Sequence, residues 1–207
     1  MARWPPPMAL DAALPGRPLN HATLFDATAQ ALRRGLIAVL CCLPLGGATA
    51  QVDAARIDVI RVAFTLNFAR YTGWPEGAPT DSFRLCVSAG DSLYEAFATA
   101  DNTLVRGRPV RLRRIVPGAA DVSRCDLLYL SGTTENRSGL LQSVASLPVL
   151  TVGDDPLFLS GGGTIRLFTG DQRMQFDINL AQAERARLVL SPQLLRLAHS
   201  VNQGKAP

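Results

Sequence analysis

Apolar residues recur at every third or fourth position between residues 57 and 71, and a Trp-Pro pair follows them. This spacing predicts a helix, because side chains three and four residues apart lie on the same side of it. The residues that would share this side are Ile57, Ile60, Phe64, Asn67 and Tyr71, with Phe68 beside them. Pro75 disfavours helical geometry at Trp74, so the helix should end at or before that residue. Asn67 is expected to be buried and hydrogen-bonded, because a buried amide without a partner costs about 1–3 kcal/mol.

Three short, mostly apolar runs at residues 83–87, 126–130 and 149–152, and the arginine-rich segment at residues 111–115, predict β-strands further along the chain. Helical patterns lie between them, one continuing through Ala98 after the turn Gly90-Asp91-Ser92 and one from Glu135 to Ser146. Runs that are almost entirely apolar are typical of strands covered on both faces of a sheet. The order of strands and helices therefore predicts an α/β fold: a single layered domain with a mixed, mostly parallel sheet and helices on both faces.

The carboxy-terminal part has the pattern of a β-hairpin followed by two helices. Residues 164–178 alternate on either side of the turn Thr169-Gly170-Asp171-Gln172, which predicts an antiparallel hairpin at one edge of the sheet. A helix is expected over residues 180–188. Ser191-Pro192 is typical of the cap and first position of a last helix, which would run through Val201.

The first fifty residues differ from the rest and end in the three parts of a secretory signal. A pair of arginines precedes about a dozen apolar residues and the small-x-small cleavage site Ala48-Thr49-Ala50. The apolar run is shorter than the roughly 20 residues that span a bilayer. We therefore expect residues 1–50 to be a leader with a cleavable signal peptide and residues 51–207 to form a single exported domain. An uncleaved membrane anchor and lipidation at Cys41 or Cys42 are the alternatives.

Removal of the leader changes the charge and the cysteine count. The leader carries four arginines and two aspartates, so its loss lowers the formal net charge from +4 to +2, which gives no indication of nucleic-acid binding. Cys86 and Cys125 are the cysteines that remain, and an even pair in an exported protein usually forms a disulfide. Cys86 lies in the first predicted strand and Cys125 at the entrance to the third, so they can pair if those strands are neighbours. Two free buried thiols are the alternative.

The processed chain lacks the residues that common catalytic and metal sites need. His21 belongs to the leader, so His199 is the one histidine left, and we expect it at the surface near the end of the last helix. One imidazole cannot form a histidine-based metal cluster or a Ser-His-Asp triad. Asp154-Asp155 precedes a proline and is more typical of a solvated turn than of an acid–base or cation site. Gly161-Gly162-Gly163 lacks nucleotide-binding spacing. We therefore predict no catalytic residues, no metal and no cofactor.

Arginines are densest just before and within the second predicted strand, at Arg106, Arg108, Arg111, Arg113 and Arg114. Alternation places Arg111 and Arg113 on one face of that strand, opposite Leu112. The simplest interpretation is a solvated edge strand protected by charge. A surface for anionic head groups or an acidic protein is the alternative.

The chain from about residue 58 to residue 201 resembles the YfiR-like family of periplasmic proteins. The motifs that carry the resemblance are Ala63–Tyr71 with Trp74-Pro75, Val149–Asp154, Gly161–Ile165, Phe176–Asn179 and Leu194–Ala198, together with Cys86 and Cys125 at the expected places of the family disulfide. Family members with a second cysteine pair differ from this chain, where Ser160 and Leu167 stand at about those positions. A second regulatory bridge is therefore not expected here.

The resemblance implies a regulatory binding protein and not an enzyme. It implies a periplasmic repressor that binds the periplasmic part of an inner-membrane diguanylate cyclase, which lowers cyclic di-GMP signalling and biofilm formation. It also implies a homodimer and a second partner, a peptidoglycan-associated outer-membrane lipoprotein. A periplasmic small-molecule sensor domain, with a pocket at the strand ends, is the alternative, and a hydrolase fits the sequence least.

Partner binding is predicted on the carboxy-terminal third, because an edge hairpin exposes backbone groups and a terminal helix can leave apolar side chains uncovered. The residues assigned to this surface are Arg173, Phe176, Asp177, Asn179, Leu194 and Leu195. In the alternative interpretation Phe176, Ile178 and Leu195 simply close the core. The arginines at 106–114 are the next candidate surface.

Overall fold

The computed structural model describes residues 47–77, 81–88, 90–115, 121–171 and 173–203. The predicted leader lies outside these residues, except that the backbone of residues 47–50 is helical. Apart from Gly47, the described residues belong to one compact unit, residues 48–207. None of the described helices combines the length and the hydropathy that a bilayer crossing requires.

The unit is built on an eight-stranded sheet with the strand order β10-β8-β7-β6-β5-β2-β4-β3. Neighbours are parallel except at β7–β8 and β3–β4, which are antiparallel. The strands are β2 (Phe83–Ser88), β3 (Leu104–Val105), β4 (Arg108–Arg114), β5 (Leu127–Leu130), β6 (Leu150–Gly153), β7 (Ile165–Gly170), β8 (Arg173–Asn179) and β10 (Ser200–Asn202). A separate two-stranded antiparallel sheet joins β1 (Thr72–Gly73) to β9 (Val189–Leu190).

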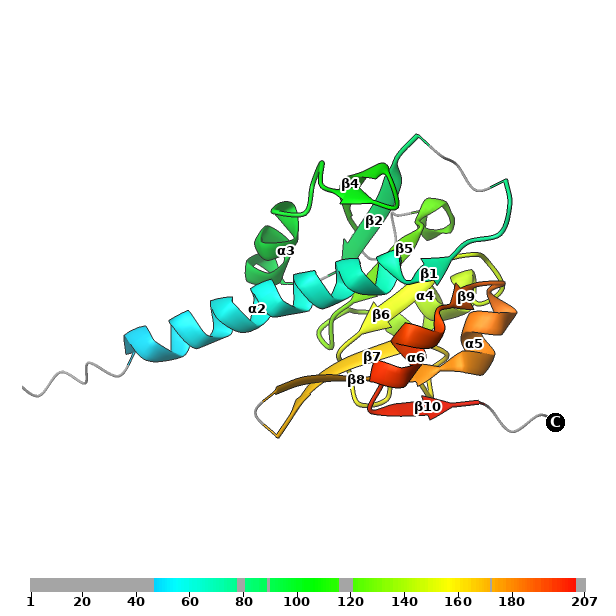
Figure 1. Ribbon diagram of the computed structural model, residues 1–207. Helices are drawn as coiled ribbons and strands as arrows, with labels where there is room; N and C mark the ends of the chain where they lie inside the picture. Colours follow the sequence, from blue (N-terminus) through cyan, green and yellow to red (C-terminus); the bar gives the residue numbers. More distant parts are fainter. Residues whose placement is uncertain (1–46, 78–80, 89, 116–120, 172, 204–207) are drawn as a thin grey trace, which may run out of the picture. The chain divides into compact units, whose positions relative to one another are not determined.

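Helices cover both faces of the large sheet, as predicted (Figure 1). One apolar cluster joins the strands to α2 (Gly47–Arg70), α3 (Asp91–Ala98), α5 (Leu180–Arg185) and α6 (Pro192–Leu197). A second cluster joins the opposite face to the short 3-10 helix η1 (Val122–Arg124) and to α4 (Arg137–Val144). Alternate residues of β5 serve the two clusters, with Leu127 and Tyr129 in the first and Leu128 and Leu130 in the second. A strand covered on both faces has no polar side, which explains its continuous apolar run.

The predicted buried side of α2 is wrong. Asn67 is exposed, and its Oδ1 accepts a hydrogen bond from Arg70 Nη1 at 2.8 Å. The helix instead buries a neighbouring stripe that contains Val62, Leu66, Phe68 and Ala69. Apolar residues occur on both stripes, and the chosen rotation buries Phe68 while leaving the Asn67 amide in water. The core therefore avoids the cost of desolvating an amide.

The end of α2 agrees with the prediction, because the helix stops at Arg70, before Trp74. The ring of Trp74 packs edge-on against Phe83, with the centroids 5.4 Å apart. Pro75 is half-buried beside it. The Trp-Pro pair thus connects the helix to the first strand of the large sheet.

The predicted hairpin forms, but β10 covers part of it, so among the described residues only 173–176 of β8 remain at the edge of the sheet. The last helix ends at Leu197 instead of continuing through Val201, and β10 pairs in parallel with residues 177–179 of β8. Ser191 caps α6 as predicted, with its hydroxyl accepting from Leu194 N at 3.2 Å. The open edge of β8 explains the error at the carboxyl end, because pairing its backbone groups favours an extended chain over another helical turn.

Candidate functional site

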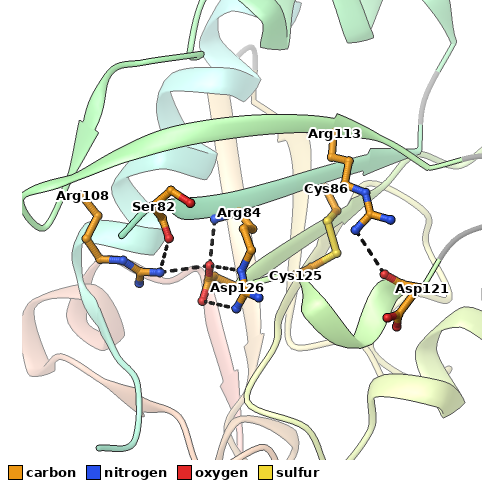
Figure 2. A network of polar contacts seen from close by, with 8 residues as sticks. All are labelled: Ser82, Arg84, Cys86, Arg108, Arg113, Asp121, Cys125 and Asp126. Atoms are coloured by element: carbon orange, nitrogen blue, oxygen red, sulfur yellow. Dashed lines mark hydrogen bonds and ion pairs between the residues drawn. A yellow bond between two sulfur atoms is a disulfide. The ribbon is translucent and has the colours of Figure 1, made fainter. Parts of the chain in front are cut away.

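A buried aspartate, Asp126, organises the polar contacts directly before β5. Its Oδ2 accepts from the backbone N of Arg84 at 2.7 Å and from Arg84 Nε at 3.0 Å, while Oδ1 accepts from Arg84 Nη2 at 3.2 Å. Arg108 Nη2 also lies 3.2 Å from Oδ2, and Figure 2 shows the carboxylate between the two guanidinium groups. Asp126 is 2% exposed, so this carboxylate is buried and neutralised by two permanent cations.

Strand register brings these side chains together. β2 and β5 are parallel with Leu85 opposite Leu127, which places Arg84 beside Asp126 at the start of both strands. Arg108 begins β4 on the other side of β2, and it also donates to the backbone O of Ser82. The arginines therefore tie three strands to one carboxylate.

The predicted disulfide forms next to this network. Cys86 and Cys125 are bonded, with their Cα atoms 5.8 Å apart, and both side chains are buried (Figure 2). The two cysteines can pair because β2 and β5 are neighbours, as the sequence-based prediction required. A covalent link and a charge network thus fix the same pair of strands.

Other members of the arginine cluster act mainly on nearby backbone and side-chain groups. Arg106 Nη1 donates to Thr72 O at 3.1 Å, and Arg111 donates to Asn102 Oδ1. Arg113 Nη1 lies 3.4 Å from Asp121 O. The strand that carries these arginines is covered at its first residues by β3, so it is not a fully open edge. These contacts favour a structural role for much of the cluster.

Asp121 caps η1 on the side of the disulfide. Its Oδ1 accepts from the backbone N of Ser123 at 3.0 Å and from the Ser123 hydroxyl. The hydroxyl bond, followed by the backbone bond, lowers the pKa of the Asp121 carboxyl below its ordinary value. The cap is therefore stronger with an ionised carboxylate, which accepts both bonds.

A second buried aspartate, Asp177, lies in β8. Its Oδ1 accepts from Ser200 Oγ at 2.6 Å and contacts His199 Nδ1 at 3.0 Å. Its Oδ2 lies 3.4 Å from Arg166 Nη1. The imidazole of His199 is exposed, as predicted, and stacks edge-on against Phe168 with the centroids 5.6 Å apart. This carboxylate fixes the short β10 pairing and holds one ring nitrogen of the histidine.

A groove runs beside this aspartate, between α2, the free half of β8 and the segment that follows α6. Its volume is about 430 Å³, and it is lined by Phe64, Arg173, Met174, Gln175, Phe176, Leu197, Ala198 and His199. β10 pairs only with residues 177–179 of β8, so residues 173–176 have no strand on that side within the described part of the chain. The groove is thus an apolar surface next to a strand edge, with two basic side chains among its lining residues.

The structure separates the six residues assigned to partner binding. Arg173 is exposed and lines the groove, and Phe176, which is largely buried, contributes to its wall. Asp177 holds the contacts described above, and Asn179 caps α5 by accepting from Gln182 N at 3.1 Å. Leu194 is buried, and Leu195 is half-buried against the same core. Arg173 and Phe176 are therefore the two of the six that meet at a surface hollow.

Asp154 is not simply a solvated turn residue, which corrects the expectation for Asp154-Asp155. Its Oδ1 accepts from Gly132 N at 2.6 Å, and its Oδ2 lies 3.4 Å from the Tyr129 hydroxyl. Arg61 Nη2 approaches the same oxygen at 3.7 Å. Tyr129 is fully buried, and burial, followed by the charge of Asp154, raises the pKa of its phenol. Asp154 thus joins α2 to the carboxyl ends of β5 and β6.

Sequence reasoning missed the role of Asp126. The available signal was an aspartate at the start of an apolar strand, which is unusual inside a sheet covered on both faces. Its partners, however, lie 42 and 18 residues away in sequence.

Within the described ranges, no group of three or more His, Cys, Asp or Glu side chains has an arrangement that could hold a metal ion.

A comparison with protein families gives a match that extends over most of these helices and strands. A family model described as YfiR/HmsC-like matches residues 58–199, well over half of the chain. The matched segment begins in α2, includes the disulfide, Asp126 and Asp177, and ends at His199. The resemblance seen in the sequence motifs is confirmed, and the chain belongs to the YfiR/HmsC-like family.

Proposed function

We propose that this protein is a periplasmic repressor that binds the periplasmic part of an inner-membrane diguanylate cyclase and thereby lowers cyclic di-GMP signalling and biofilm formation. Membership of the family indicates a regulator of diguanylate cyclase signalling, and the family is regulatory and not catalytic. The observation that carries the proposal is the groove beside the free half of β8. An apolar hollow at a strand edge suits a protein partner.

The groove offers two kinds of contact to the cyclase. Residues 173–176 of β8 can pair with an extended segment of a partner, and side chains of that segment can enter the hollow lined by Phe64 and Phe176. Arg173 and His199 favour an apolar segment that also carries carboxylates. Asp177, Asn179, Leu194 and Leu195 support this surface from beneath by holding β10, α5 and α6 in place.

Release of the cyclase needs a competitor. We propose that a peptidoglycan-associated outer-membrane lipoprotein sequesters the protein, and that the working form is a homodimer. A competitor that occupies the same groove would relieve repression without changing the fold. The lipoprotein and the cyclase should therefore bind in a mutually exclusive manner.

Charge reversal at the groove tests the proposal. Arg173→Glu changes an exposed side chain, so the free energy of unfolding should change by less than about 0.5 kcal/mol. Arg113→Glu is the matched control, because Arg113 is exposed on β4, and four strands separate β4 from β8. Each variant is returned to a deletion strain, cyclic di-GMP is measured, and binding to the periplasmic part of the cyclase is titrated.

We expect the deletion to raise cyclic di-GMP, Arg113→Glu to restore repression, and Arg173→Glu to fail with about a tenfold loss of affinity. Unchanged cyclic di-GMP in the deletion strain, with the cyclase expressed, refutes repression. A folded Arg173→Glu variant that represses fully places the interface elsewhere. If Arg113→Glu alone loses repression, the interface is assigned to the arginines at 106–114.

A further inference from the structure

We propose that a second cleft, at the amino-terminal ends of β2, β5 and β6, binds a small organic anion through a carboxylate or phosphate group. The cleft has a volume of about 350 Å³, which is within the usual size of small-molecule sites. The lining residues that matter here are Trp74, Arg84, Arg124, Asp126 and Arg187, with Glu76 and Cys125 beside them. It has no lining residue in common with the groove beside β8.

The balance of charge in the cleft favours an anion. Asp126 does not offset the other cations, because its two oxygens are already occupied by Arg84 and Arg108. Arg124 has only an exposed ion pair with Asp121 at 3.5 Å, and Arg187 forms no ion pair with any described residue. Glu76 is exposed and can offset one of these two charges. Asp121 offsets the other, so the net positive charge that remains is the excess at Asp126, where two arginines share one carboxylate. Guanidinium groups bind carboxylates and phosphates with matched geometry.

The backbone presents Arg187 in an unusual way. Its φ of 57° is in the left-handed region, where a side chain is disfavoured and glycine is the usual residue after a helix. Hydrogen bonds from Arg187 N to Glu184 O at 2.8 Å and from Leu188 N to Ala183 O at 2.9 Å hold this conformation. The turn at the end of α5 therefore fixes the backbone from which the Arg187 side chain reaches the cleft.

The part of the cleft formed by Trp74 and Cys125 is also held in place. Trp74 packs against Phe83, and the disulfide fixes Cys125. Trp74 follows β1 and Arg187 precedes β9, and these two strands pair with each other. A bound anion would contact segments on both sides of that pairing, while the indole ring offers an apolar wall to the rest of the ligand. Preformed walls lower the entropic cost of binding.

Fluorescence of Trp74 gives a direct test. Trp4 is the other tryptophan of the chain, so the full chain with Trp4→Phe leaves Trp74 as the one indole. Citrate and inorganic phosphate, up to about 10 mM, are titrated separately to distinguish carboxylate from phosphate, with glycerol as the neutral probe. The thermal unfolding midpoint is recorded as a second readout, because a ligand that binds the folded state raises it.

Two variants remove cations from the cleft. Arg187→Gly removes the guanidinium and relieves the left-handed backbone, so it should fold at least as well as the parent chain. Arg124→Gln changes an exposed side chain. Arg196→Gln, on the exposed part of α6 and outside the cleft, is the control for net charge.

We expect saturable binding of citrate, phosphate or both, no response to glycerol, and about tenfold weaker binding in the two cleft variants but not in the control. The probe that binds identifies the anionic group. The absence of a saturable response to either anion overturns the proposal, and so does an equal loss of affinity in Arg196→Gln. Repression of the cyclase is not part of this readout, so the two proposals fail independently.

Discussion

Asp126 and Asp177 are both buried carboxylates of the same sheet, but their partners differ in kind. Asp126 lies in the middle of the sheet before β5 and is paired with two arginines, Arg84 and Arg108. Asp177 lies beside the edge strand β10 and is paired with a weaker arginine contact, a hydroxyl and the exposed imidazole of His199. One centre is held by two guanidinium groups, and the other is held in part by an exposed side chain at the edge of the sheet.

This difference assigns different tasks to the two centres. The surroundings of Asp126 include the disulfide and three strands, so any movement there would disturb the centre of the sheet. The surroundings of Asp177 include a short strand and the lining of the groove, where small rearrangements disturb little of the core. The first centre is therefore held by groups in the middle of the sheet, and the second lies beside the groove near its edge.

The largest effect is expected from removal of the disulfide. Cys86 and Cys125 are 39 residues apart in sequence, so the double variant Cys86→Ala/Cys125→Ala should lose about 4 kcal/mol of unfolding free energy in the chain-entropy model. Urea denaturation measures this loss, and the unmodified chain unfolded under reducing conditions should match the variant. Two alkylatable thiols in the native, unreduced protein without its leader, and so without Cys41 and Cys42, would contradict the prediction.

The two aspartates can be compared directly by neutral substitution. Asp126→Asn leaves two arginines without a full counter-charge in a buried setting, so we expect a loss of about 3 kcal/mol. Asp177→Asn should cost about 1 kcal/mol, because His199 is exposed and can be solvated when its partner is lost. Equal losses in urea denaturation would show that the partners of the two carboxylates do not distinguish them.

A third carboxylate, Asp154, extends the comparison, because it contacts the neutral hydroxyl group of Tyr129. The raised pKa of the Tyr129 phenol means that the folded state holds this proton more tightly than the unfolded state, whose phenol has the ordinary value of about 10. The stabilisation is complete below that pH and is lost as the pH rises above it. At pH 11 the loss should be about 1.4 kcal/mol relative to neutral pH.

Tyr129→Phe removes this titration. Its unfolding free energy should therefore fall less between pH 9 and 11 than that of the unmodified chain, when both are measured by urea denaturation. As a control, tyrosinate absorbance is recorded for both proteins. The variant still contains Tyr94, which is half-exposed, and Tyr71, which is exposed. A parallel decline of both proteins would refute the assignment.

The long elements of this fold could be predicted because each carried its own local signal. β2, β4, β5, β6 and the β7–β8 hairpin all appeared as apolar or alternating runs, and the disulfide followed from two cysteines in neighbouring strands. The short strands β1, β3, β9 and β10 have two or three residues each, too few for a period to be recognised. β3 and β10 pair with edges of the large sheet, and β1 and β9 pair with each other, so all four depend on segments that are brought together by the rest of the fold.

The candidate sites were less predictable for the same reason. The expected edge hairpin directed attention to Arg173 and Phe176, which line the groove, but it did not show that Phe64 of α2 completes it. The second cleft combines residues from 74 to 187, and none of them stands in a local motif for anion binding. Such sites are formed by contacts between distant segments, which a single sequence does not encode as a pattern.

The smallest effect is expected at Asn67, where the structure overturned the sequence interpretation. If Asn67 were buried and bonded to the core, Asn67→Ala would leave its partners unsatisfied and cost about 1–3 kcal/mol. The exposed position and the single bond to Arg70 predict a change within about 0.5 kcal/mol, and alanine also has the higher helix propensity. Phe68→Ala, the matched variant on the adjacent buried stripe, should cost about 3–5 kcal/mol. Urea denaturation of the two variants therefore reports which side of α2 faces the sheet, and similar losses in both would restore the original assignment of Asn67 to the core.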